Sequence, residues 1–234
     1  MVKTTERENM KENLKKSDLL LLSKSKLFSQ IGISELTSVL SCLDTRTASY
    51  KKGETILLVG NPIKAVGIVL SGSLQIVKED IDGSRVIMAA IGAPEMFGEA
   101  ICCAGLSISP VSVIADTDSS VMFLNFPRIL RVCSNACSFH AKLIENMLQI
   151  LAQKNLFLQN RMDIISSKSI RDRVLKYLAS FPSDRGKPIE IPLNREKMAE
   201  YLCTDRSALS HELMRMKRDG VISYERNRFL ILNS

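Results

Sequence analysis

The chain has 234 residues, of which 45% are hydrophobic and 24% charged, and its formal net charge is +7. This length allows two modest domains, each with its own core. The apolar runs, such as residues 19–22 and 56–59, are too short to cross a bilayer, and the charged residues 1–16 lack the apolar stretch of a secretory signal. We therefore expect a cytoplasmic protein without a membrane partner.

Charge is distributed unevenly along the chain. Residues 166–234 carry 14 Lys and Arg against 9 Asp and Glu, whereas residues 18–165 carry 13 of each kind. A basic segment attached to a neutral one indicates a polyanionic partner for the basic part.

Cysteine and histidine are the residues that could form disulfides or hold a metal. They are Cys42, Cys102, Cys103, Cys133, Cys137, Cys203, His140 and His211. Disulfides are rare in the cytosol, and the chain has no C-x-x-C pair, so we predict no disulfide, no metal site and no cofactor. A redox sensor built on Cys102 and Cys103, or on Cys133 and Cys137, stays open as an alternative.

The first half of the chain changes from helical to β-type patterning. After a polar arm at residues 1–17, leucines at helical spacing predict helices over 18–44 with a break at Gly32. From residue 45 to 125 short apolar runs alternate with Gly-containing turns, and the runs 65–70, 74–78 and 85–90 are typical of strands. Asp82-Gly83 is a hairpin-turn signal between two of them. This pattern predicts a compact barrel, sandwich or β-roll.

A long helix is predicted next, over residues 135–165. Its apolar residues recur at helical spacing and no Gly or Pro interrupts them; they are Leu143, Met147, Ile150, Leu151, Phe157, Leu158, Ile164 and Ile165. Such a helix would be about 45 Å long. Its apolar stripe needs a partner, either a copy of itself in a dimer or the β domain of its own chain.

The last third alternates short helices and turns. We expect a helix over 169–180, a loop over 181–188, a helix-turn-helix over 194–218 and two short strands, 221–224 and 229–232, on either side of Arg226-Asn227. This order is the outline of a winged helix.

The second helix of this motif would carry the side chains that read DNA. Asn194 and Asp205 are good N-caps, with Thr204 another candidate at the second helix. Met198, Ala199, Leu202, Leu209 and Leu213 form an inner side, which leaves polar and cationic groups outward for base edges and phosphates. The candidate DNA-binding residues are Asn194, Arg195, Thr204, Arg206, Ser207, Ser210 and His211.

No constellation in the chain is typical of catalysis. Activated nucleophiles, paired carboxylates and phosphate-binding glycine loops are not recognisable. We therefore predict that the protein is not an enzyme and has no catalytic residues.

Four segments in this order resemble the cyclic-AMP receptor protein/FNR (Crp/Fnr) family of bacterial regulators. They are Lys52-Gly53-Glu54-Thr55-Ile56, Val69-Leu70-Ser71-Gly72-Ser73-Leu74, Phe97-Gly98-Glu99 and Asp205-Arg206-Ser207-Ala208-Leu209-Ser210. The resemblance covers about residues 20–232. It implies an α+β fold with an effector-binding, cyclic-nucleotide-binding-like β-roll over 18–134, a dimerisation helix over 135–165 and a winged helix-turn-helix DNA-binding domain over 166–234.

The same resemblance implies partners. A homodimer would bind a two-fold symmetric operator in double-stranded DNA and change transcription when a small-molecule effector settles in the roll; RNA polymerase is a further candidate partner. Whether the regulator activates or represses depends on where the operator lies relative to the promoter. An effector-independent DNA binder, with the roll as a dimer scaffold, is the alternative.

Departures from the family pattern concern the effector. Cyclic-nucleotide binders of this family carry an Arg ten residues after Glu99 to hold the cyclic phosphate, whereas this chain has Ser109 and then Pro110. A neutral hydroxyl cannot supply that charge-assisted contact, so we expect an effector other than cyclic AMP. The candidate effector-binding residues are Phe97, Gly98, Glu99, Ala100, Ser109, Pro110 and Leu158.

Other departures concern cofactors and DNA sequence. With only Cys42 ahead of the roll, a four-cysteine iron–sulfur site is not expected, and neither histidine lies in the roll to ligate haem. In the reading helix Ser207 replaces a frequent Glu and His211 a frequent Arg, so we expect an unusual operator half-site.

Overall fold

The computed structural model describes residues 15–79, 85–130, 139–182 and 187–232. The chain divides into two compact units, Met1–Leu151 and Ala152–Ser234, which are described separately. Most of the expected polar arm, the Asp82-Gly83 turn, Cys133 and Cys137 lie outside the described residues. None of the described helices is long and apolar enough to cross a membrane.

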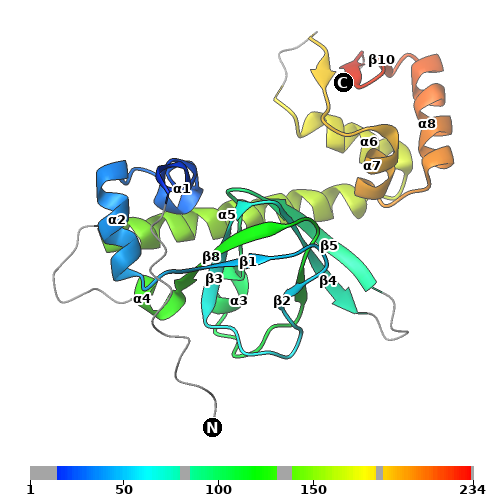
Figure 1. Ribbon diagram of the computed structural model, residues 1–234. Coiled ribbons are helices and arrows are strands. Elements are labelled where there is room, and N and C mark those ends of the chain that lie inside the picture. Colours follow the sequence, from blue (N-terminus) through cyan, green and yellow to red (C-terminus); the bar gives the residue numbers. More distant parts are fainter. Residues whose placement is uncertain (1–14, 80–84, 131–138, 183–186, 233–234) are drawn as a thin grey trace. The chain divides into compact units, whose positions relative to one another are not determined.

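Short helices begin the first unit (Figure 1). They are α1 (Lys16–Leu22), a 3₁₀ helix (Lys26–Phe28) and α2 (Ile33–Cys42). The N-cap of α2 is Gly32, whose backbone N–H donates to Glu35 Oε2 at 3.0 Å, and a carboxylate in the first turn also suits the positive end of the helix dipole. The helices predicted over 18–44, with a break at Gly32, are confirmed.

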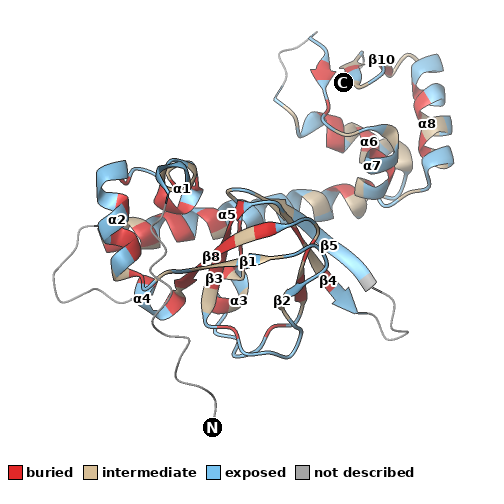
Figure 2. Ribbon diagram, viewed as in Figure 1, coloured by how far each residue is buried: buried red, intermediate tan, exposed pale blue. Residues whose placement is uncertain are grey.

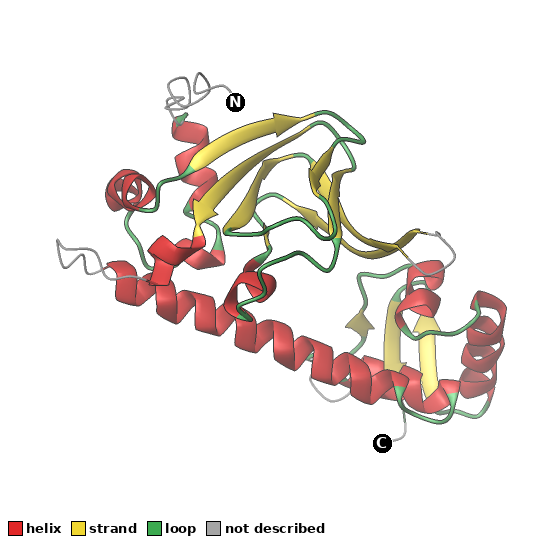
Figure 3. Ribbon diagram, turned by 90° about the horizontal axis from the view of Figure 1, so that it is seen from below, coloured by secondary structure: helices red, strands yellow, loops and turns green. Residues whose placement is uncertain are grey.

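The strands described in the first unit form two four-stranded antiparallel sheets (Figure 3), with orders β1-β8-β3-β6 and β2-β7-β4-β5. They are β1 (Arg46–Tyr50), β2 (Thr55–Leu57), β3 (Ala65–Ser71), β4 (Ser73–Glu79), β5 (Arg85–Gly92), β6 (Met96–Phe97), β7 (Ser112–Ala115) and β8 (Ser119–Asn125). Two short helices, α3 (Glu99–Cys103) and α4 (Phe126–Leu130), complete the roll. The predicted strands 65–70, 74–78 and 85–90 are confirmed within β3, β4 and β5.

Close packing inside the roll depends on a glycine in β3. Gly67 pairs with Phe97 of β6, and a Cβ added to Gly67 would lie 2.2 Å from Phe97 Cζ. The Phe97 ring is buried and meets Phe123 edge-on, with centroids 6.3 Å apart. Because a side chain at Gly67 would occupy the space of this ring, Phe97 could not keep its present position with any other residue there.

The long helix α5 spans Phe139–Ile165, which is 27 residues and about 40 Å. Within the first unit, Leu143, Met147 and Ile150 are buried in the same core as the helices and strands. The first part of α5 thus packs on its own chain, which was one of the two partners expected for its stripe. Other apolar side chains stay exposed: Leu148, Leu156, Phe157, Leu158 and Met162.

The second unit is a winged helix-turn-helix, as predicted. Its elements are α6 (Ile170–Ala179), β9 (Ile189–Glu190), α7 (Arg195–Tyr201), α8 (Arg206–Arg218), β10 (Ile222–Glu225) and β11 (Arg228–Ile231). The strands form an antiparallel sheet of order β10-β11-β9. Its core includes Val174, Leu178, Met198, Leu209 and Phe229, all fully or almost fully buried. The strand β9, which the sequence did not indicate, adds a third strand to the wing.

Candidate nucleic-acid interface and effector pocket

The two helices of the turn motif are fixed at their starts by side-chain caps. Asn194 Oδ1 accepts the backbone N–H of Lys197 at 2.9 Å. Asp205 Oδ1 accepts the N–H groups of Ser207 and Ala208 at 2.7 and 3.2 Å, so Asp205 rather than Thr204 is the cap of α8. Each cap supplies an acceptor for N–H groups that a helix start leaves unsatisfied, so Asn194 fixes where α7 begins and Asp205 fixes where α8 begins.

Burial divides α8 into two sides (Figure 2). Leu209, Leu213 and Met216 are buried, whereas Arg206 and His211 are exposed. The buried side anchors the helix in the core of the second unit. The opposite side therefore presents a guanidinium and an imidazole to solvent, groups that donate to base edges or phosphates.

The two candidate serines of α8 hydrogen-bond within their own helix. Ser207 Oγ donates to Asp205 Oδ1, and Ser210 Oγ donates to the carbonyl oxygen of Arg206 at 2.9 Å. A hydroxyl that donates locally keeps only its acceptor capacity for another partner. In this conformation Arg206 and His211 are therefore the stronger candidates for donating to bases.

The side chain of Arg195, the first residue of α7, contacts the wing, although its place at a helix start suggested a phosphate contact. Its Nη2 donates to the carbonyl oxygen of Arg226 at 2.7 Å, and the guanidinium lies 4.8 Å from the centre of the Phe229 ring and 5.1 Å from that of Tyr224. Burial lowers the pKa of this guanidinium from its ordinary value. Arg195 thus ties α7 to the wing through a carbonyl and two aromatic rings.

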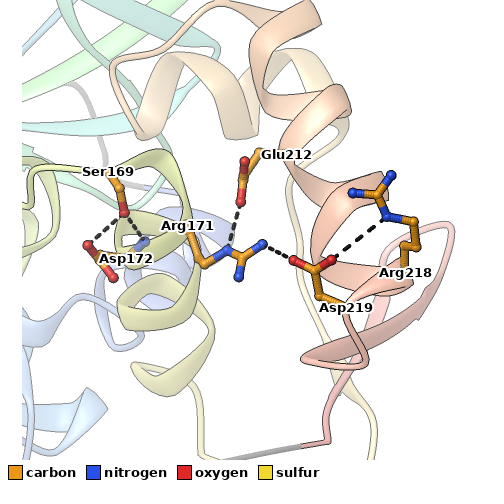
Figure 4. Close-up of polar contacts among 6 residues, drawn as sticks. All are labelled: Ser169, Arg171, Asp172, Glu212, Arg218 and Asp219. Atoms are coloured by element: carbon orange, nitrogen blue, oxygen red, sulfur yellow. Dashed lines mark hydrogen bonds and ion pairs between the residues drawn. The ribbon is translucent and has the colours of Figure 1, made fainter.

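An ion-pair cluster joins α6 to α8 (Figure 4). Arg171 Nε donates to Glu212 Oε1 at 2.8 Å, and Arg171 Nη2 donates to Asp219 Oδ2. The hydrogen bond from Arg171 is the main reason why the pKa of Asp219 lies below its usual value. By engaging both the middle and the end of α8, Arg171 fixes the orientation of this helix on α6.

Further exposed cations surround α8, and the sequence patterns did not single them out. They are Lys197, Arg215, Lys217, Arg218, Arg226 and Arg228. Arg226 and Arg228, which we call the wing cations, lie in and just after the turn between β10 and β11. The signal that could have found them is the basic turn Arg226-Asn227, because cations in a turn between two strands are able to contact phosphates.

The first half of the candidate effector pocket lies where β6 leads into α3. Gly98 has a φ of +80° and caps α3, and a Cβ on it would lie 3.0 Å from Ile63 Cδ1. Glu99, which follows, is 3% exposed, whereas Ala100 is exposed. The left-handed backbone at Gly98 therefore turns the chain so that the Glu99 carboxyl group is buried in the roll.

Ser109 occupies the second half of the candidate pocket. It is 1% exposed, and its Oγ donates to the carbonyl oxygen of Val111 at 2.7 Å. Its backbone pairs with Asn61 and Gly60, at 2.9 and 2.8 Å. The two halves are thus held by one segment, residues 60–65. Pro110 is exposed, and Leu158 lies in the other unit with 56% of its surface exposed.

Two of the thiols proposed for a redox sensor are poorly suited to it. Burial is the main cause that raises the pKa of Cys102 to about 11, and burial also raises the pKa of Cys103. The thiolate is the reactive form, so both thiols are less reactive than a free cysteine. No group of three or more His, Cys, Asp or Glu that could hold a metal is found within the part of the chain that the structure describes.

Two family models match this chain, and each falls on one of these regions. The cyclic nucleotide-binding domain matches residues 47–136, and the Crp-like helix-turn-helix domain matches residues 172–234. The chain belongs to the Crp/Fnr family of transcriptional regulators. It is accordingly a DNA-binding regulator with a cyclic nucleotide-binding domain, in a family that is not enzymatic.

Two transcriptional regulators are similar to this chain at low sequence identity. The chain is 24% identical over 205 residues to the transcriptional activator protein FnrL of Cereibacter sphaeroides, covering 79% of this chain and 75% of FnrL. It is 23% identical over 226 residues to a CRP-like cAMP-activated global transcriptional regulator of Mycobacterium tuberculosis, covering 92% and 95%.

Solved structures show the same fold at low identity. CprK complexed with OCPA matches with a TM-score of 0.60 at 14% identity, covering 85% of this chain and 89% of CprK. The c-di-GMP responsive global regulator CLP of Xanthomonas campestris matches with a TM-score of 0.53 at 15% identity, covering 87% and 100%.

Proposed function

We propose that this regulator is a homodimer whose two helix-turn-helix motifs bind a two-fold symmetric operator, and that a small molecule other than cyclic AMP gates this binding. The residues proposed to contact DNA are those of the sequence prediction, with the wing cations added. The observation that carries the effector proposal is Ser109, buried and hydrogen-bonded within its own loop.

The dimer proposal rests on the exposed side of α5. Leu148, Asn155 and Met162 are seven residues apart, and so are Leu151, Leu158 and Ile165. Leu148, Leu158 and Met162 are 63%, 56% and 67% exposed, which is unusual for large apolar side chains repeated along one stripe. A seven-residue repeat is the pattern of two helices that pack together, and a single Asn in such a seam favours one register. A second copy of α5 fits this stripe.

The proposal about the effector follows from the absence of a positive charge on the side chain at position 109. The relative from Mycobacterium tuberculosis is named as cAMP-activated, and a cyclic phosphate needs a fixed cation for a charge-assisted contact. At the position where the family resemblance places that cation, this chain has a hydroxyl that already donates to Val111. We therefore propose an effector whose recognition does not depend on a phosphodiester.

Thermal unfolding with added ligands tests this proposal. Cyclic AMP should leave the unfolding midpoint unchanged, whereas a true effector at about a hundred times its Kd would stabilise the protein by about 2.7 kcal/mol. Ser109→Arg should gain a response to cyclic AMP, and Ser107→Arg, which adds the same charge at an exposed position, should not. A midpoint raised by cyclic AMP in the unmodified protein would overturn the effector proposal.

The alternative is an effector-independent DNA binder with the roll as a scaffold. A screen of small acids, nucleotides and aromatic compounds separates the two, since the alternative predicts that none of them raises the midpoint. RNA polymerase remains a candidate partner, and a regulator that contacts it should bind its operator more tightly when the polymerase is present.

A further inference from the structure

A cysteine and a histidine that the proposed function does not use meet where α2 ends and α5 begins. Cys42 is the last residue of α2 and His140 lies in the first turn of α5. Cys42 Sγ and His140 Nε2 are 3.8 Å apart, across 98 positions of sequence. Cys42 is half-buried, whereas His140 is only 1% exposed. Both belong to the first unit.

The burial of His140 gives this contact its significance. The imidazole stacks on Phe139, with ring centres 4.8 Å apart, and its Nδ1 has no hydrogen-bond partner within the described ranges. Buried polar atoms usually have partners, and an exception calls for an explanation such as a chemical role. For this imidazole the thiol of Cys42 is the polar contact that the structure records. The ring is therefore placed to exchange a proton with the thiol.

Some charged groups near Cys42 favour a thiolate there and others disfavour it. Arg128 of α4 donates through Nη1 to the carbonyl oxygen of Cys42 at 3.3 Å, which brings a guanidinium to the end of α2. Asp44 lies 3.7 Å from the same guanidinium and offsets part of its charge, and the C-terminal end of a helix itself disfavours an anion. The imidazole is the group that can take up the thiol proton directly.

We propose that Cys42 and His140 form a reactive-thiol site, in which His140 activates Cys42 for modification by peroxides and other small electrophiles. His140 Nε2 accepts the Sγ proton, which leaves a thiolate beside an imidazolium. With a peroxide, the thiolate forms an S–O bond and the O–O bond breaks. The leaving oxygen takes the proton from the imidazolium. The products are a sulfenic acid and water or an alcohol, with sulfur oxidised and peroxide reduced by two electrons.

Two other thiols of the first unit provide the contrast. Cys102 and Cys103 are the adjacent pair that the sequence suggested for redox chemistry, and burial raises the pKa of both. Within the described residues, Cys102 Sγ faces the carbonyl oxygen of Ala65 at 3.8 Å rather than a histidine. The chemistry expected of that pair is thus assigned to Cys42.

Competitive alkylation of the full-length protein tests the site without reference to DNA or to oligomeric state. The purified chain is treated with limiting iodoacetamide near neutral pH in the presence of EDTA, and mass spectrometry of peptides gives the rate at each cysteine. Cys42 should react faster than Cys103 and Cys203, although both of these are more exposed. A rate at Cys42 equal to or below theirs would overturn the proposal.

A matched variant isolates the imidazole. His140→Gln keeps a polar group within reach of Sγ but cannot accept the proton, so alkylation of Cys42 should slow by about tenfold. The rates at Cys103 and Cys203 should stay unchanged, and they also report whether the variant is folded. An unchanged rate at Cys42 in a folded variant would contradict the role of His140.

If His140→Gln does not fold, the unmodified protein still provides a test. The rate of Cys42 alkylation should reach half its maximum at a pH below about 8.5, the ordinary value of a free thiol. Half-maximal reaction at or above that pH would overturn the proposal. Dilute hydrogen peroxide followed by dimedone should then label Cys42 before the other thiols.

Discussion

α5 and α8 both bury one side in a core, but their other sides have different chemistry. On α5 the exposed stripe is apolar and includes Leu148, Leu158 and Met162. On α8 the exposed side carries Arg206 and His211, with further cations in the last turns and the wing. Both helices have one buried and one exposed side because of the same helical periodicity. The chemistry of the exposed side chains therefore determines which partner each helix can bind. An apolar stripe suits a second copy of the helix, and exposed cations suit a polyanion.

A charge in the apolar stripe should have the largest effect. Leu158→Glu places a carboxylate from each chain in the proposed seam and removes two leucines that this seam would bury, each worth about 1.5–3 kcal/mol. We expect the Kd of the dimer to rise by at least about a hundredfold, measured by sedimentation equilibrium. Phe157→Glu is the matched control, because Phe157 is 55% exposed but outside the seven-residue repeat. Equal weakening by both variants would remove the basis for this seam.

Arg206→Ala on α8 should have the next largest effect, a loss of specific DNA binding. Loss of a guanidinium that contacts a base costs about 1–3 kcal/mol and relaxes specificity at one operator position. Binding titrations on a set of operator variants at fixed salt measure this effect. Lys24→Ala removes the same charge from an exposed site in the first unit and should leave binding unchanged. A uniform loss over all DNA sequences would make Arg206 a phosphate contact instead.

The wing cations should contribute affinity without sequence preference. Arg228→Ala should weaken binding to all DNA sequences alike and reduce the slope of log K against log salt by about 2, about 1 for each chain of the proposed dimer. Comparing the sequence preference and the salt dependence of this variant with those of Arg206→Ala distinguishes a phosphate contact from a base contact. If Arg228→Ala changed sequence preference and left the salt dependence as it was, the wing would have a different role.

The smallest effect should be a change in how the stability of the fold falls at acid pH. Asp219 bonds to Arg171 and Asp205 caps α8, and hydrogen bonds hold the pKa of each below its usual 3.8. A lowered pKa in the folded chain stabilises it above about pH 4, and this contribution disappears as pH falls through the lowered values. Asp219→Asn should therefore flatten the fall of the unfolding midpoint below about pH 4. Glu200→Gln, an exposed neutral replacement, should not alter it.

The sequence predicted those features that follow from local periodicity and capping. The two sides of α8, the caps Asn194 and Asp205 and the strands β10 and β11 each depend on residues within a few positions of one another. Arg195 could not be placed this way, because the carbonyl group that it contacts, that of Arg226, lies 31 positions away. Arg171 reaches Glu212 over 41 positions, a pairing that only the packing of α6 on α8 creates.

The candidate effector-binding residues of the roll show more strongly what local sequence patterns cannot predict. The two halves of the candidate pocket, at Gly98 and Ser109, are brought together by a third segment, residues 60–65. The loss of a cation at position 109 could be inferred from the family resemblance. That the hydroxyl is buried and donates to Val111 depends on the loop conformation, which no periodic pattern encodes.

The most direct test of a dimeric regulator is the mass of its complex with DNA. DNA bound by the full-length protein is selected from a randomised pool, and the mass of the purified complex is measured in solution. We predict two chains on each duplex and a two-fold symmetric site, with half-sites about 10 base pairs apart, or a multiple of that spacing. One chain per duplex, or a selected site without symmetry, would contradict the account.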